Sequence, residues 1–206
     1  MQTAPQPRPT FDELYRQLRA LPQHQTGEIL NGDLIVSPRP AIRHANVSTV
    51  MGHDLVGPFH RRSGGPKGPG GWWILPEPEL HFQLPGQTHV LSPDLAGWKR
   101  ERLPMLPDVA YLTLAPDWVC EILSPSTARY DRRGKARIYH QAGVTWRWLV
   151  DPKERVLEAY RREGNFWVQL GIWEDEEKVC VEPFDAVELD LSDWWDVEPK
   201  EEGEAI

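Results

Sequence analysis

Two carboxylates and one lysine stand where buried, chemically active side chains are expected. Asp94 and Glu121 each interrupt a short run of apolar residues, and a buried carboxylate is costly unless it is paired or binds a metal. Lys135 precedes Ile138 and Tyr139 by three and four residues, so on a helix it shares their apolar stripe and points inward. This combination suits a site that binds a hard divalent cation and hydrolyses a phosphodiester.

Each of the three side chains has a role in that chemistry. Asp94 and Glu121 would hold Mg²⁺ or Mn²⁺, because carboxylate oxygens are preferred ligands of hard cations. Lys135 would orient the attacking water or offset charge in the transition state. The alternative is structural: Lys135 and Glu121 could form a plain buried ion pair, because an inward lysine needs an acidic partner.

A second acidic segment offers further metal ligands. We expect residues 72–82 to form one strand, and alternation along it places Glu77, Glu79 and His81 on one face. Glu77 or Glu79 would then join Asp94 as a ligand. The two prolines of this segment are typical of an edge or irregular strand, where the acids would simply be solvated.

One histidine shares a helical stripe with apolar residues. His44 falls in line with Val47, Met51 and Leu55 in a helix predicted over residues 42–59. A histidine in such a position is usually a core residue with its hydrogen bonds satisfied. The alternative is that His44 touches substrate or metal-bound water.

The elements around these residues alternate between helical and strand periodicity. Thr10 and Glu13 form a capping-box pattern that begins a helix reaching Ala20, and Asn31-Gly32 predicts a two-residue hairpin turn. We further expect strands at residues 72–82, 90–98, 118–123 and 145–150, a helix at 128–142 that ends at Gly143, and a hairpin of 156–160 with 166–171. The strand at 118–123 is apolar on both faces and should be central.

This order predicts an α/β fold, a mixed sheet with helices packed on it, in a single domain over residues 1–206. Residues 1–9 and 198–206 are expected to be flexible ends. The chain shows no apolar run long enough for a membrane span. Its two isolated cysteines suit the reducing cytoplasm.

Charge is distributed unevenly along the chain. The net charge is −8, yet residues 124–162 carry +6 and residues 163–206 carry −13. A local basic face can bind nucleic-acid phosphates whatever the total charge, although both segments could also be ordinary solvated faces. The basic side chains expected to contact phosphates are Arg129, Arg132, Arg133 and Arg137 of the helix, with Arg61 and Lys67 of the glycine-rich loop.

Several spaced motifs together resemble one known family. They are Glu28-Ile29 with Asn31-Gly32, the helix carrying His44, Ser92-Pro93-Asp94, Glu121 to Thr127, Asp131, Lys135, Tyr139, Gly143-Val144, and Trp148 to Pro152. The run is similar to the Uma-type restriction endonuclease family of the PD-(D/E)XK nuclease superfamily, over about residues 10–195.

The resemblance implies a PD-(D/E)XK restriction-endonuclease-like core and a DNA substrate, with a homodimer as a further expectation for cutting both strands. Asp94 matches the first acid of the motif, Glu121 matches the second, and Glu28 matches an extra acid of some members. The superfamily pattern has a lysine two residues after the second acid, where this chain has Leu123. The resemblance therefore implies that Lys135, on the next helix, replaces that lysine.

Leu123 and the negative net charge keep two other interpretations open. In the first, the protein retains the nuclease fold but only binds nucleic acid or another protein. In the second, the acids and Lys135 form a purely structural ion-pair core without affinity for metal. Divalent-metal binding between Asp94 and Glu121 discriminates between these interpretations and the enzyme.

Overall fold

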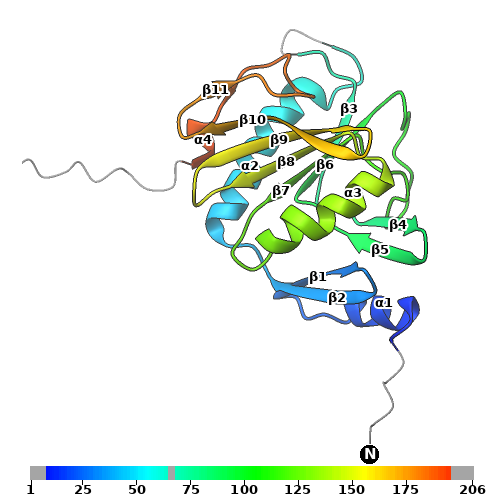
Figure 1. Cartoon of the computed structure of the whole chain (residues 1–206). Coiled ribbons are helices and arrows are strands. Elements are labelled where there is room, and N and C mark those ends of the chain that lie inside the picture. The colour runs from blue at the N-terminus through cyan, green and yellow to red at the C-terminus, as the bar shows by residue number, and fades with distance from the viewer. Residues whose placement is uncertain (1–7, 65–67, 196–206) are drawn as a thin grey trace, which may run out of the picture.

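A six-stranded mixed sheet forms the centre of the computed structural model, which describes residues 8–64 and 68–195 (Figure 1). The strand order is β10-β9-β8-β7-β6-β3, and all neighbours are antiparallel except β7 and β8. The strands are β3 (Trp72–Pro76), β6 (Leu95–Lys99), β7 (Trp118–Ile122), β8 (Trp146–Asp151), β9 (Val156–Glu163) and β10 (Phe166–Glu174). The predicted α/β fold is therefore confirmed, and β7 is central.

A smaller antiparallel sheet lies against the same core, in the order β2-β1-β5-β4. Its strands are β1 (Gln25–Leu30), β2 (Asp33–Pro38), β4 (Leu80–Leu84) and β5 (Gln87–Leu91). At the predicted hairpin turn between β1 and β2, Asn31 and Gly32 both adopt positive φ, 54° and 81°, as the two-residue turn requires. A third, two-stranded sheet pairs β11 (Lys178–Val179) with β12 (Leu189–Asp190).

Helices cover both faces of the large sheet (Figure 1). One face packs on α2 (Ile42–Phe59), α4 (Ser192–Trp195) and the segment near β11 and β12; the other packs on the helix η1–α3 and on strands of the small sheet. η1 (Tyr130–Lys135) is a π-helix that continues as α3 (Ala136–Ala142), and α1 (Phe11–Arg19) packs on the small sheet. No helix within residues 8–64 and 68–195 is long and apolar enough to cross a membrane.

Local sequence signals explain where the helices begin and end. The Thr10 hydroxyl accepts a hydrogen bond from the Glu13 N–H while the Glu13 carboxylate accepts from the Thr10 N–H, so the predicted capping box is confirmed. α3 ends at Gly143, whose φ of 92° suits glycine at this position. The predicted helix over residues 42–59 is also confirmed.

Two strand predictions were wrong because the chain bends twice near the site. The expected strand over residues 72–82 divides into β3 of the large sheet and β4 of the small sheet, and the expected strand over residues 90–98 divides into β5 and β6. Prolines that cannot donate to a ladder lie at both bends, and Glu77 adopts a positive φ of 45°. Asp94 therefore lies in a connection just before β6 and not inside a strand.

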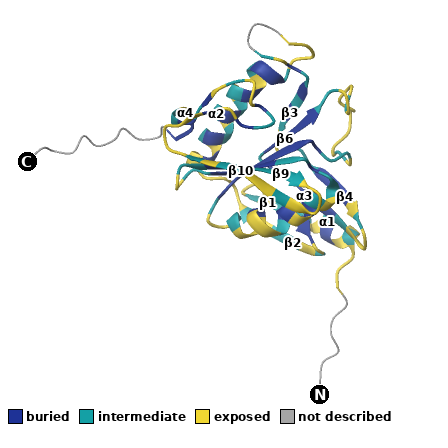
Figure 2. Ribbon diagram, turned by 45° about the horizontal axis from the view of Figure 1, so that its top comes forward, coloured by how far each residue is buried: buried dark blue, intermediate teal, exposed yellow. Residues whose placement is uncertain are grey.

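Alternation along β7 decides which way Glu121 points. Trp118, Cys120 and Ile122 belong to the cluster that packs on α2, whereas Val119 belongs to the cluster on the opposite face with α3. Because neighbouring side chains of a strand alternate between faces, Glu121 faces η1–α3 with Val119. The central strands β6, β7 and β8 are among the most buried parts of the molecule, whereas the edge strand β10 is largely exposed (Figure 2).

Candidate active site

A cavity of about 340 Å³ lies where the small sheet, the start of α2 and the segment after β7 meet. Its walls come from β1 and β2, from the first turn of α2, and from the loop that connects β7 to η1. Acidic and basic side chains from β1, α2, β7, η1 and the connections before β4 and β6 face this one space. The lining includes the predicted residues Glu28, His44, Glu77, Asp94, Glu121 and Lys135, together with Asp131.

Lys135 lies at the centre of an ion cluster. Its Nζ is 3.0 Å from Glu121 Oε2, 2.9 Å from Glu28 Oε2 and 3.0 Å from Asp131 Oδ1, and its side chain is only 5% exposed. Burial alone would lower the pKa of Lys135, but the three carboxylates outweigh burial and raise this pKa well above its ordinary value. The lysine is therefore a fixed positive charge inside the protein.

Glu121 is held at both oxygens. Oε2 accepts a hydrogen bond from Lys135, and Oε1 accepts one from the Tyr139 hydroxyl at 2.5 Å. Burial raises the pKa of Glu121 well above its usual range; Lys135 opposes the rise, and the neighbouring acids Asp131, Glu28 and Asp94 add to it. The carboxyl group thus sits among more negative charge than one lysine neutralises, which favours the arrival of another cation or a proton.

The Asp94 side chain contacts both the end of β7 and the start of α2. Its Oδ2 accepts a hydrogen bond from the Ile122 N–H at 2.7 Å, and its Oδ1 lies 3.1 Å from His44 Nε2. Burial lowers the pKa of His44, but the bond to Asp94 and its negative charge reverse the direction, so the pKa is raised. His44 therefore has a cavity-facing partner, although it shares the core stripe of α2.

Glu77 and Glu79 are separated by the bend between β3 and β4. Glu77 lines the cavity; its N–H donates to the Asp94 carbonyl at 3.1 Å, and its own carbonyl accepts from the Ser92 hydroxyl at 3.2 Å. Glu79 is not among the residues that line this cavity. Its Oε1 accepts from the Tyr15 hydroxyl at 2.8 Å and lies 2.7 Å from His81 Nε2. The prediction that the two acids share a face was wrong, because the chain bends between them and the alternation of a strand ends there.

Sequence reasoning missed two residues of this cluster as site candidates. Asp131 contacts Lys135 from the preceding turn of the helix, and Tyr139 binds Glu121 from the following turn. Both lie four residues from Lys135. The helical spacing of Asp131, Lys135 and Tyr139 was the available signal, because residues four apart share a helix face.

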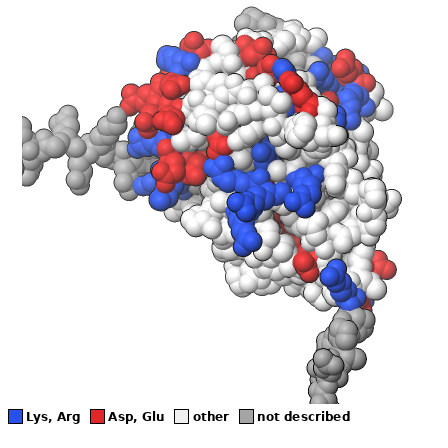
Figure 3. Space-filling model, viewed as in Figure 1, with Lys and Arg blue, Asp and Glu red and all other residues white. Residues whose placement is uncertain are grey.

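The predicted basic residues divide into two groups. Arg129, Arg132, Arg133 and Arg137 are exposed on η1–α3, and Figure 3 shows Lys and Arg side chains gathered over this helix. Arg132 is already paired, with its Nη2 2.6 Å from Glu158 Oε1.

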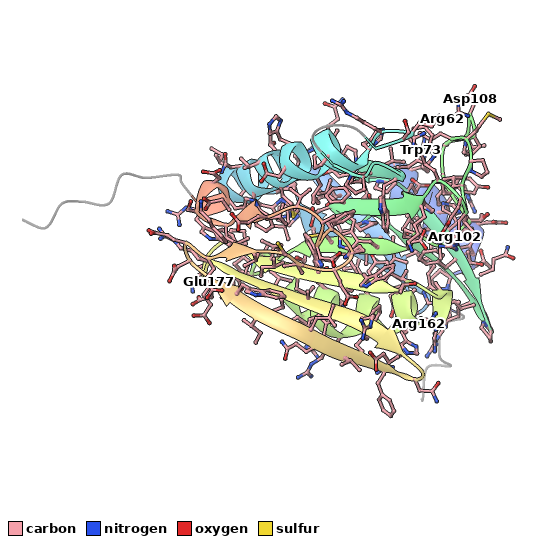
Figure 4. All side chains as sticks on the ribbon, turned by 90° about the horizontal axis from the view of Figure 1, so that it is seen from above. Arg62, Trp73, Arg102, Asp108, Arg162 and Glu177 are labelled. Carbon is pink, nitrogen blue, oxygen red and sulfur yellow. The ribbon has the colours of Figure 1, made fainter. Side chains whose placement is uncertain are left out.

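Arg61 does not belong to the same face. It follows the last turn of α2, whereas His44 lies in the first turn, and a helix of this length spans roughly 27 Å. Figure 4, which labels Arg62 and Trp73, shows that end of the molecule. Since α2 and η1–α3 also pack on opposite faces of the large sheet, the expectation that Arg61 lies beside the helix arginines was wrong. Lys67 lies outside the described residues.

The donor set at the cavity suits a hard divalent cation. Five carboxylates, those of Glu28, Glu77, Asp94, Glu121 and Asp131, line the cavity with one lysine. Among the described residues no three His, Cys, Asp or Glu side chains are placed to hold one ion, and the Lys135 ammonium fills the space between three of the acids. Mg²⁺ commonly uses only one or two carboxylates and keeps several waters, so metal binding by Asp94 with Glu121 stays a prediction.

Comparisons of fold and sequence with known proteins show which family the chain belongs to. The structure of a protein from Anabaena variabilis, described as a "putative nuclease belonging to DUF820", is similar with a TM-score of 0.68 at 20% identity, covering 88% of this chain and 96% of that chain. Residues 11–192 match the Uma2 family, described as "Putative restriction endonuclease", and the chain belongs to this family. A comparison with curated proteins gives no match.

Proposed function

We propose that the protein is a metal-dependent endonuclease that hydrolyses phosphodiester bonds in DNA. The observation that carries the proposal is that Asp94, Glu121 and Lys135 face one cavity, with the lysine 3.0 Å from Glu121. Membership of a restriction-endonuclease family supports the same class of reaction.

Each side chain has a separate task in the proposed reaction. Asp94 and Glu121 would hold Mg²⁺ or Mn²⁺, and the bound cation would polarise the phosphate and lower the pKa of a bound water. Lys135 supplies fixed positive charge that offsets the charge developing on the phosphate. Tyr139 and the Ile122 N–H keep the two carboxylates in place. Glu77 and His44 lie on the cavity wall, where they contact the Asp94 backbone and side chain.

The outer side of the lysine helix would contact the DNA backbone. Arg129, Arg133 and Arg137 are exposed on η1–α3, whose inner side carries Lys135. Arginines bind phosphates through bidentate hydrogen bonds, so the strand would be held next to the cavity. A homodimer would bring one cavity to each strand of a duplex. Both cysteines are free thiols, which suits a cytoplasmic enzyme.

A plasmid-cleavage assay tests the proposal. Supercoiled DNA should be nicked or linearised with Mg²⁺ or Mn²⁺ and should stay intact with a chelator. Asp94→Asn should lose cleavage at any metal concentration, because the neutral amide is a poor ligand for a hard cation. Wild-type protein that leaves single-stranded and duplex DNA intact with both metals would refute the proposal.

A nucleic-acid-binding protein without catalysis is the second candidate function. Three carboxylates already surround the three donors of Lys135, and Leu123 stands where the superfamily pattern has a lysine. These features favour a structural ion cluster. This candidate predicts DNA binding that salt weakens, with no cleavage and no calorimetric signal for Mn²⁺.

A further inference from the structure

The Lys135 ammonium is surrounded as a metal ion would be. Three carboxylates from three separate elements, Glu28 of β1, Glu121 of β7 and Asp131 of η1, lie 2.9–3.0 Å from one nitrogen. The side chains of Glu121 and Asp131 are each 2% exposed. Asp131 Oδ1 is buried and accepts no hydrogen bond from the described residues, so its contact with the ammonium is an ion pair alone.

The same three acids could close on a cation with a small movement. Oxygen ligands of Ca²⁺ lie at about 2.3–2.6 Å, so each carboxylate would need to move inward by roughly half an ångström from its present distance to Nζ. Carboxylate side chains reach such positions by small rotations about their terminal bonds. Only the tethered ammonium stands between these acids and an ordinary cation site.

Glu121 links this cluster to the proposed catalytic metal. It faces the cavity with Asp94 on one side and is bound to Lys135 on the other. Many nucleases place two metal ions about 3.5–4 Å apart in one site. In the proposed enzyme Glu121 would belong both to the pair that holds the catalytic metal and to the group around the lysine.

We propose that Glu28, Glu121 and Asp131 form a latent second cation site, which the Lys135 ammonium occupies in place of a metal ion. The latent site follows from the ion cluster itself. Its consequence for catalysis rests on the proposed function: the enzyme would work with a single divalent ion, because the chain supplies the second positive charge. Removing the ammonium should therefore turn the three acids into a site for Ca²⁺ or Mn²⁺.

Calorimetric titration with Mn²⁺ and Ca²⁺ tests this site in the Asp94→Asn background. Asp94→Asn alone should bind no divalent ion tightly, because the Asp94–Glu121 pair is broken. Asp94→Asn with Lys135→Met should bind one, with an affinity at least tenfold higher. Adding Glu28→Gln to that double variant should remove the gain. No binding by the double variant would overturn the proposal, since a merely strengthened Asp94–Glu121 site cannot form without Asp94.

A matched control and a folding readout complete the test. Lys153→Met removes an exposed lysine and should leave metal binding unchanged; an equal gain there would show a general charge effect and overturn the proposal. If the Lys135→Met variants unfold without metal, Ca²⁺ should restore folding and raise the Tm, and failure to do so contradicts the latent site. Should wild type neither bind metal nor cleave DNA, the proposed function fails while a gain in the double variant still supports the latent site.

Discussion

Lys135 Nζ lies 3.0 Å from Glu121 Oε2, across the crossover that connects the parallel strands β7 and β8. Both residues belong to one β-strand–helix–β-strand unit, in which the helix packs back onto the strand that precedes it. Leu123, at the position of the usual superfamily lysine, is a buried core residue. Lys135, on the helix that follows β7, thus contacts Glu121 in place of a lysine at position 123.

We predict that Lys135→Met abolishes DNA cleavage. The methionine keeps most of the packing volume of the lysine stem but leaves three buried carboxylates without a positive partner. The metal-free protein should therefore also lose about 3–5 kcal/mol of unfolding free energy. Urea unfolding in a chelator and a plasmid assay on the same preparation measure the two effects. A variant that is destabilised to this degree yet still cleaves DNA would remove Lys135 from the catalytic residues.

Tyr139→Phe tests how Glu121 is held. The change deletes the hydroxyl that donates to Glu121 at 2.5 Å and leaves the ring, so we expect a loss of about 1–3 kcal/mol in stability. Mn²⁺ affinity should also fall, because the carboxylate is free to turn. Tyr160→Phe is the matched control, since its hydroxyl donates to Glu158, which does not line the cavity. Equal Mn²⁺ affinity in all three proteins would contradict a positioning role.

The exposed arginines should determine how salt affects DNA binding. Arg133→Ala with Arg137→Ala should lower the slope of log K against log salt by about 2, since each phosphate contact contributes roughly 0.9. Arg132→Ala should have a smaller effect, because Glu158 already binds that side chain. Arg61→Ala should leave the slope unchanged, and a large effect there would relocate the DNA-binding face to the other end of α2.

The His44–Asp94 pair should make stability depend on pH. The pKa of His44 is raised in the folded protein, so protonated His44 is favoured there and stabilises the fold fully below its unfolded pKa of about 6.5. This contribution is lost as pH rises through the raised folded value. Urea unfolding in a chelator between about pH 6 and 9 should show wild type losing its advantage over His44→Gln. A constant difference across that range would contradict the pairing.

Much of the fold could be predicted because its signals are local. The capping box at Thr10, the Asn31-Gly32 turn and Gly143 each act through their own backbone conformation. The bend at Glu77 escaped prediction, because alternation describes which face a residue occupies but not which sheet its strand joins. Two consecutive strands, β3 and β4, pair in different sheets, and only long-range packing decides that.

The candidate site shows the same division between local and long-range information. The apolar stripe of the helix correctly predicted that Lys135 points inward to Glu121. Four-residue spacing from Lys135 would also have identified Asp131 and Tyr139 as site residues. The contact between Lys135 and Glu28 could not be derived from spacing, since the two residues are far apart in sequence and only the packing of η1 on the small sheet brings them together. Glu79 was misplaced because the chain bends between it and Glu77, so Glu79 contacts Tyr15 and His81 while Glu77 lines the cavity.

The Lys135 ammonium group contacts both the small and the large sheet. Lys135 binds Glu28 of the small sheet and Glu121 of the large sheet at once, so any breathing motion that parts the sheets also dismantles the cavity. The exchange rates of amide hydrogens of β1 near Glu28 should therefore depend on whether the cavity is occupied and Lys135 is present. They should not depend on the stability of the β1–β2 hairpin alone. An occupied cavity would slow this exchange, and loss of the lysine would quicken it, in a strand of the sheet opposite the helix that carries the change.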